Sequence, residues 1–93
     1  MPTAFREVTI INERGLHARP AMEFVDVANR FQSEVRVFSL GEEKLEVDGK
    51  SIMQMMTLAA VQGTPLRIEA NGDDAEQAVL ELAQLIDGKF GEE

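Results

Sequence analysis

The sequence contains no cysteine, no tryptophan, no tyrosine and only one histidine among its 93 residues. Without cysteine there is no disulfide, no thiolate nucleophile and no zinc–thiolate site. A single histidine cannot form a histidine-based metal site, so we expect no metal ion and no cofactor. The few aromatic side chains also leave little surface on which the bases of a single-stranded nucleic acid would stack.

Positive charge is also scarce. Nine lysine and arginine residues face 17 aspartate and glutamate residues, which gives a net charge of −8. Binding to nucleic acid depends on clustered basic side chains, so we expect no such partner. No apolar run has the length of a membrane span or a signal peptide, which predicts no membrane insertion and a cytoplasmic location. We expect residues 1–93 to form one domain.

The distribution of apolar residues predicts four strands and three helices. Four segments, at 5–11, 34–37, 44–48 and 66–70, alternate apolar and polar residues, as in strands covered on one side. Helical periodicity predicts helices at 18–31, 51–61 and 73–88. The resulting β-α-β-β-α-β-α order predicts an α+β fold, in which helices cover one face of a single sheet.

The last predicted helix carries start and stop signals. Asp73 is its expected N-cap, with Glu76 three residues later as in a capping box. Gly88 is expected to close it. Its predicted buried stripe consists of Ala75, Ala78, Val79, Leu82, Leu85 and Ile86.

The most informative segment is Gly-Leu-His-Ala-Arg-Pro-Ala at positions 15–21. Pro20 suits a first helical turn, so a helix is expected to begin near residue 18, directly after His17. The first N–H groups of a helix are unpaired and carry the positive end of its dipole. A phosphoryl group on His17 would therefore meet the backbone N–H groups of Ala18 and Arg19, and the Arg19 guanidinium.

A lone histidine near a helix start is more often a surface or packing residue than a nucleophile. The complete motif at 15–21, however, resembles the active-site signature of HPr, the histidine-containing phosphocarrier family of the bacterial phosphotransferase system. Residues 50–56, Lys-Ser-Ile-Met-Gln-Met-Met, are similar to the regulatory serine segment of that family. The resemblance extends over essentially the full length of the chain, including the closing helix.

The resemblance implies an open-faced β-sandwich, in which a four-stranded antiparallel sheet has three helices on one face and the last strand lies between the first two. It also implies that His17 accepts a phosphoryl group on Nδ1 from enzyme I and passes it to enzyme II A domains. Arg19 would hold the phosphoryl oxygens. Such a protein is a carrier without independent turnover, and a monomer is expected.

Ser51 has two interpretations. With Gln54 it fits a capping box, and in this interpretation it serves only to start the second helix. The resemblance instead implies regulatory phosphorylation of Ser51 by an HPr kinase/phosphorylase.

The second helix is apolar nearly all around, although a short surface helix needs only one apolar stripe. We expect Met55, Leu58 and Ala59 to pack inward. Exposed methionines are adaptable and suit surfaces that bind several partners, so the rest of the helix is expected to dock partners. A fully buried helix fits the pattern equally well. The expected docking surface consists of Leu16, Ile52, Met53 and Met56.

Two functions therefore remain open at this point. The first is a phosphocarrier that acts through His17, and the second is a regulatory interaction module of the same fold that acts mainly through Ser51 phosphorylation, without relay. The intact motif around His17 favours the first. The ending at residues 85–93 resembles the nitrogen-branch paralogue as much as the sugar-branch protein, so the branch also remains open, and the acidic surface would disfavour acidic partners.

Overall fold

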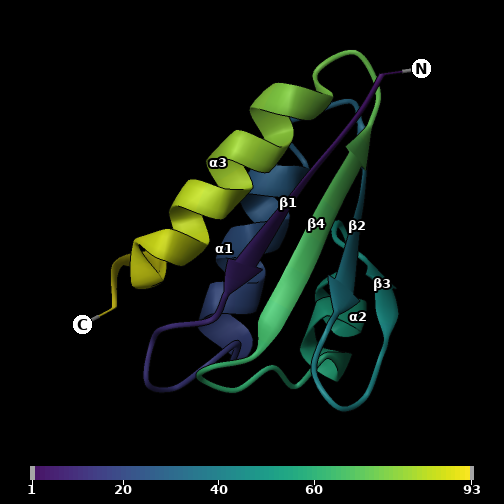
Figure 1. Ribbon diagram of the computed structural model, residues 1–93. Helices are drawn as coiled ribbons and strands as arrows, with labels where there is room; N and C mark the ends of the chain where they lie inside the picture. The colour runs from purple at the N-terminus through teal and green to yellow at the C-terminus, as the bar shows by residue number, and fades with distance from the viewer. Residues whose placement is uncertain (1, 93) are drawn as a thin grey trace.

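The computed structural model describes residues 2–92, and its elements follow the predicted order. The strands are β1 (Thr3–Thr9), β2 (Glu34–Ser39), β3 (Glu46–Asp48) and β4 (Pro65–Asn71). The helices are α1 (Ala18–Ala28), α2 (Ile52–Thr57) and α3 (Ala75–Asp87), followed by a short 3-10 segment, η1 (Lys89–Gly91), which the sequence did not predict (Figure 1).

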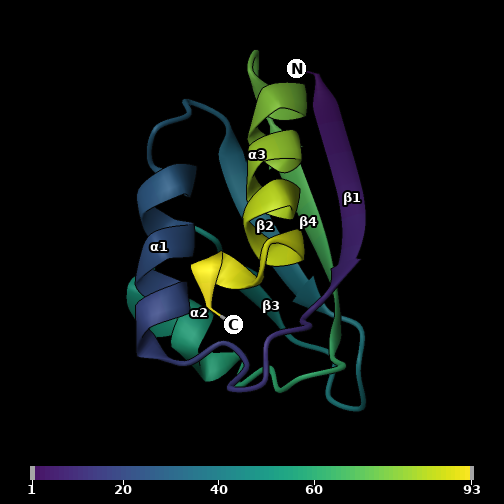
Figure 2. The ribbon, with the colours of Figure 1, turned by 90° about the vertical axis from the view of Figure 1, so that its left-hand side faces the viewer.

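The strands form one antiparallel sheet in the order β1-β4-β2-β3. The last strand therefore lies between the first two, as the family resemblance implied. The three helices lie on one face of this sheet (Figures 1 and 2). The predicted α+β open-faced sandwich is confirmed.

The core lies between the sheet and the helices. In β4, Leu66, Ile68 and Ala70 are buried, whereas the intervening residues are partly exposed. Burial of each large apolar side chain contributes about 1.5–3 kcal/mol, so this layer supplies the main favourable term in folding. The predicted stripe of α3 is also buried, except for the half-buried Leu85.

Helix α1 ends earlier than predicted, at Ala28 instead of residue 31. The Asn29 backbone N–H and its side-chain amide both donate to the Val25 carbonyl, at 2.9 and 3.0 Å. The next two N–H groups, of Arg30 and Phe31, bond to carbonyls three residues back. This tighter pattern ends an α-helix, whose bonds reach four residues back.

Helix α2 also ends earlier than predicted, at Thr57 instead of residue 61. Its last turn tightens in the same way, since the N–H groups of Leu58 and Ala59 bond three residues back at 3.2 and 3.1 Å. Ala59 then adopts a left-handed conformation, with φ of 48°. The prediction that Ala59 packs inward is therefore wrong: Ala59 is exposed and Ala60 is buried in its place.

The N-cap of α3 is Asp74, one residue later than the predicted Asp73. The Asp74 carboxylate does not cap its own helix. It accepts hydrogen bonds from the backbone N–H groups of Gln32 and Ser33, at 2.9 and 3.0 Å, and from the Ser33 hydroxyl. This tertiary contact ties the α1–β2 loop to the start of α3, and no local pattern in the sequence marks it.

These contacts predict how stability depends on pH. The hydrogen bonds from the Ser33 hydroxyl and the Gln32 N–H lower the pKa of Asp74 below its ordinary value of 3.8. A lowered pKa stabilises the folded state above that value, and the contribution is lost as the pH falls. We expect Asp74→Asn to lower the melting temperature near pH 7, and the difference from the wild type to shrink as the pH falls from about 5 through the ordinary value of 3.8 and below it. Thermal denaturation over this range measures the effect.

Asp73→Asn is the matched control, because Asp73 is exposed and makes none of these three contacts. A difference between wild type and Asp74→Asn that stays constant with pH would contradict the assignment.

Within residues 2–92, no helix is both long enough and apolar enough to cross a membrane. The same part of the chain brings no three histidine or acidic side chains together in an arrangement that would hold a metal ion.

Candidate functional site

His17 is the N-cap residue of α1, with an extended backbone (φ −80°, ψ −172°). Ala21 is the first residue whose N–H bonds back into the helix, to the His17 carbonyl at 3.0 Å. The N–H groups of Ala18 and Arg19 therefore have no intrahelical partner, and Pro20 has no N–H. The positive end of the α1 dipole lies next to the imidazole, whose side chain is 27% exposed.

The loop before His17 packs tightly against residues 60 and 61. Gly15 has φ of 69°, and a Cβ there would lie 2.6 Å from the Ala60 carbonyl oxygen. The next N–H, of Leu16, donates to that same oxygen at 2.8 Å. Glycine is required at position 15 both for this conformation and for this close approach.

Leu16 is buried, with 4% of its surface exposed. Its expected place on an exposed docking surface is therefore wrong. The backbone bond to Ala60 draws Leu16 into the core, and a sequence pattern does not report this contact.

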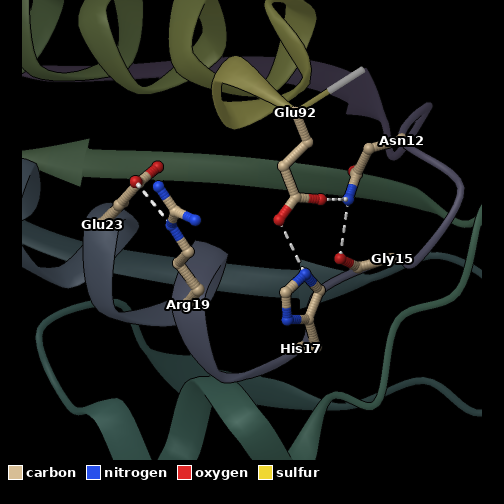
Figure 3. A network of polar contacts seen from close by, with 6 residues as sticks. All are labelled: Asn12, Gly15, His17, Arg19, Glu23 and Glu92. Atoms are coloured by element: carbon tan, nitrogen blue, oxygen red, sulfur yellow. Dashed lines mark hydrogen bonds and ion pairs between the residues drawn. The ribbon is translucent and has the colours of Figure 1, made fainter.

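Two residues that the sequence analysis did not identify complete the surroundings of His17. Its Nε2 atom lies 2.7 Å from Oε2 of Glu92, a residue 75 positions further along the chain (Figure 3). The other oxygen of that carboxylate accepts from the Asn12 amide at 3.1 Å, and the same amide donates to the Gly15 carbonyl at 2.8 Å. Asn12 is buried, and its Oδ1 atom has no hydrogen-bond partner within residues 2–92.

The environment of Glu92 favours its ionised form. Partial burial raises the pKa of this carboxyl, but hydrogen bonds from His17 and Asn12 and the nearby charges of His17 and Arg14 outweigh burial and hold the pKa below its ordinary value of 4.5. An ionised carboxylate has no hydrogen to donate. In the His17–Glu92 contact, Nε2 is therefore the donor.

Arg19 points away from the imidazole. Its Nε atom lies 3.8 Å from Oε2 of Glu23, one helical turn further on, and its side chain is 77% exposed (Figure 3). Arg14, Arg19, Glu13 and Glu92 together line an open hollow of about 250 Å³. Each guanidinium group suits an anion with several oxygens, and the two carboxylates at the same hollow balance their positive charge. Arg14 is a further basic residue that the sequence analysis did not single out.

Ser51 is the N-cap of α2, and its hydroxyl accepts from the Gln54 N–H at 3.2 Å. The Gln54 side chain does not complete the capping box by reaching the Ser51 N–H. It accepts instead from the Asp48 N–H at 2.8 Å, and so ties α2 to the end of β3. The predicted capping role of Ser51 is confirmed.

One side of α2 is apolar and exposed. Ile52, Met53 and Met56 have 40%, 80% and 45% of their surface exposed, and we call these three residues the α2 patch. Met55 is fully buried and Leu58 is 7% exposed, so the fully buried alternative for this helix is wrong. Helix α2 packs against α1, the helix that begins beside His17 (Figure 2).

A family model and a known relative both match most of this chain. The family model described as "PTS HPr component phosphorylation site" matches residues 5–88. The chain is 48% identical over 86 residues to the phosphocarrier protein HPr of Pseudomonas aeruginosa. The match covers 92% of this chain and 93% of that protein.

Solved structures of HPr proteins are also similar to this chain. A crystal structure of HPr-C-His from Thermoanaerobacter tengcongensis has a TM-score of 0.88 and 42% identity, and the match covers 97% of this chain and 98% of that one. An HPr dimer from the same organism is also similar, with a TM-score of 0.73, 44% identity, and 94% and 99% of the two chains covered.

Proposed function

Because the chain belongs to the HPr family of the phosphotransferase system, whose members are phosphocarriers and not enzymes with independent turnover, we propose that His17 carries the phosphoryl group in this protein. The observation that carries the proposal is the position of the imidazole at the start of α1, beside the N–H groups of Ala18 and Arg19. Helix N-termini of this kind stabilise phosphate oxygens.

The reacting atom in this proposal is Nδ1. The hydrogen bond to Glu92 occupies Nε2, which supports Nδ1 as the nitrogen with the free lone pair. That lone pair attacks the phosphorus of the phosphorylated donor on enzyme I. As the new N–P bond forms, the bond from phosphorus to the donor atom breaks, and its electron pair returns to the donor. Transfer to the acceptor reverses these roles.

Arg19 is proposed to hold the phosphoryl oxygens once the group is present. The exposure of its side chain supports this role, because the weak, solvent-exposed pair with Glu23 is easily exchanged for a charged phosphoryl group. A guanidinium binds such oxygens with two parallel hydrogen bonds, which lysine cannot do.

The partners proposed for the protein are enzyme I as donor, enzyme II A domains as acceptors, and the α2 patch as part of the surface that docks both. We propose a monomer as the working form, because one chain supplies every residue of the site described above. A cytoplasmic location, where these partners act by family resemblance, is part of the same proposal. The acceptor decides between the sugar branch and the nitrogen branch.

The experiment is a relay assay. The protein is incubated with purified enzyme I and labelled phosphoenolpyruvate, and then with II A domains from the sugar and nitrogen branches. We expect one acid-labile, alkali-stable phosphate, located on Nδ1 by nuclear magnetic resonance, and its loss to one of the two acceptors. A protein that takes no label from enzyme I would instead support the regulatory module that acts without relay.

Ser51 is proposed as the regulatory phosphorylation site of an HPr kinase/phosphorylase. A phosphate there adds about −1.5 to −2 charges beside the apolar α2 patch, at the start of a helix that tolerates negative charge. We expect phospho-Ser51 protein to accept phosphate from enzyme I about tenfold more slowly or worse, with little change in melting temperature. Initial transfer rates and thermal denaturation measure the two effects.

Ser51→Ala is the control, because it lacks the hydroxyl that a kinase modifies and is expected to transfer at the unmodified rate. If phospho-Ser51 protein also transfers at that rate, inhibition is refuted. If the kinase places no phosphate on Ser51, this residue serves only as the helix cap.

A further inference from the structure

Glu92 reaches His17 through an unusual stretch of backbone. After α3, Lys89, Phe90 and Gly91 all have left-handed conformations, with φ of 59°, 56° and 73°. Residues with a Cβ rarely adopt this conformation, and it persists where the surrounding structure enforces it. Here the Phe90 side chain is buried in the core, with 4% of its surface exposed. The reversal after α3 is thus anchored, and it directs Glu92 toward α1 (Figures 2 and 3).

Both oxygens of the Glu92 carboxylate accept hydrogen bonds. One accepts from Nε2 of His17 at 2.7 Å and the other from the amide of Asn12 at 3.1 Å. Asn12 is in turn bonded to the Gly15 carbonyl at 2.8 Å, within the loop that leads to His17. The carboxylate is therefore oriented by a buried residue of the same loop, and its direction toward Nε2 is set independently of the imidazole.

We infer that Glu92 is a positioning residue for phosphoryl transfer: it holds His17 in the tautomer with hydrogen on Nε2 and the lone pair on Nδ1. A carboxylate that accepts from one ring nitrogen fixes which nitrogen carries the hydrogen. This inference rests on the proposed function for its effect on transfer, whereas the tautomer itself is a property of the unphosphorylated protein.

The same carboxylate also matches the charge that develops during transfer. When Nδ1 bonds to phosphorus, the donor keeps the electron pair of the bond that breaks, and Nε2 keeps its hydrogen. The imidazole ring therefore becomes a cation in the product. Glu92 places a negative charge 2.7 Å from that ring, with no movement of a proton.

The test compares Glu92→Ala with Glu13→Ala, because Glu13 lines the same hollow but does not contact the imidazole. Nitrogen-15 chemical shifts of His17, recorded at about pH 9 where a histidine side chain is neutral, report the ratio of the two tautomers. We expect Glu92→Ala to lower the ratio of the Nε2–H form to the Nδ1–H form by about tenfold, and Glu13→Ala to leave it unchanged.

Transfer rates supply the second measurement. With enzyme I, we expect Glu92→Ala to lower the maximal rate of His17 phosphorylation about threefold or more, with the half-saturating concentration unchanged. Glu92→Gln keeps an acceptor oxygen but not the charge, so it is expected to retain more of the wild-type tautomer ratio than Glu92→Ala while losing rate.

Equal tautomer ratios in wild type and Glu92→Ala would overturn the inference, whatever the transfer rate. An equal change of the tautomer ratio in Glu13→Ala would also overturn it, because the change would then come from the loss of one negative charge and not from the contact with the imidazole. A changed ratio with an unchanged maximal rate would remove the positioning role. Failure of wild-type protein to accept phosphate would refute the proposed function instead, and the tautomer measurement distinguishes that case.

Discussion

Replacing His17 with alanine is expected to abolish phosphoryl acceptance from enzyme I. The sequence contains no other imidazole and no thiol, so no other histidine or cysteine can take the group. The His17 side chain is partly exposed and its contact is with Glu92 near the end of the chain, so the fold is expected to survive the change. The measurement is the label retained after incubation with enzyme I and labelled phosphoenolpyruvate, with circular dichroism as the check on folding.

The contribution of Arg19 is tested in the same assay. A hydrogen bond to a charged group contributes about 1.5–3 kcal/mol, so Arg19→Ala is expected to slow transfer about 10- to 100-fold. Arg30→Ala is the matched control, because Arg30 is an exposed arginine just beyond the opposite end of α1. An unchanged transfer rate in Arg19→Ala would exclude Arg19 from holding the phosphoryl group. For the preceding prediction, acid-labile label on His17→Ala protein would show that the acceptor residue has been assigned wrongly.

Met53→Asp is expected to weaken binding to enzyme I about tenfold or more, with little change in melting temperature. Met53 is 80% exposed in the α2 patch, so an aspartate there stays in water in the free protein. In a docked complex the same carboxylate would be buried against a partner without a compensating charge, which costs free energy. Binding by calorimetry and thermal denaturation measure the two quantities separately.

The neighbouring methionine provides the contrast. Met55 is fully buried in the core, so Met55→Asp is expected to unfold the protein at room temperature or to cost about 3 kcal/mol or more in the free energy of unfolding. The docking surface proposed at the α2 patch is small, which suits a carrier that must leave each partner quickly. Unaltered affinity in Met53→Asp would exclude the residue from the interface, and loss of the fold in that variant would place it in the core.

The sequence by itself determined the order of the four strands and three helices, and the position of the key histidine at a helix start. Alternation in β4 depends on nearest neighbours along the chain, since residues two apart share one face of a strand. The helical start after His17 is equally local, because Pro20 and the apolar spacing behind it act within one or two turns. The buried stripe of α3 and the capping by Ser51 belong to the same class of short-range information.

Only the tertiary structure decided which residues surround that histidine and which surfaces remain exposed. Leu16 is buried because its loop meets Ala60, and Asp74 turns from its own helix toward Ser33. Glu92 reaches His17 only because the chain reverses after α3, and nothing near residue 92 in the sequence encodes that contact. Hydrogen bonds between residues 40 or more positions apart depend on the packed sheet and helices, so local periodicity and capping patterns do not predict them.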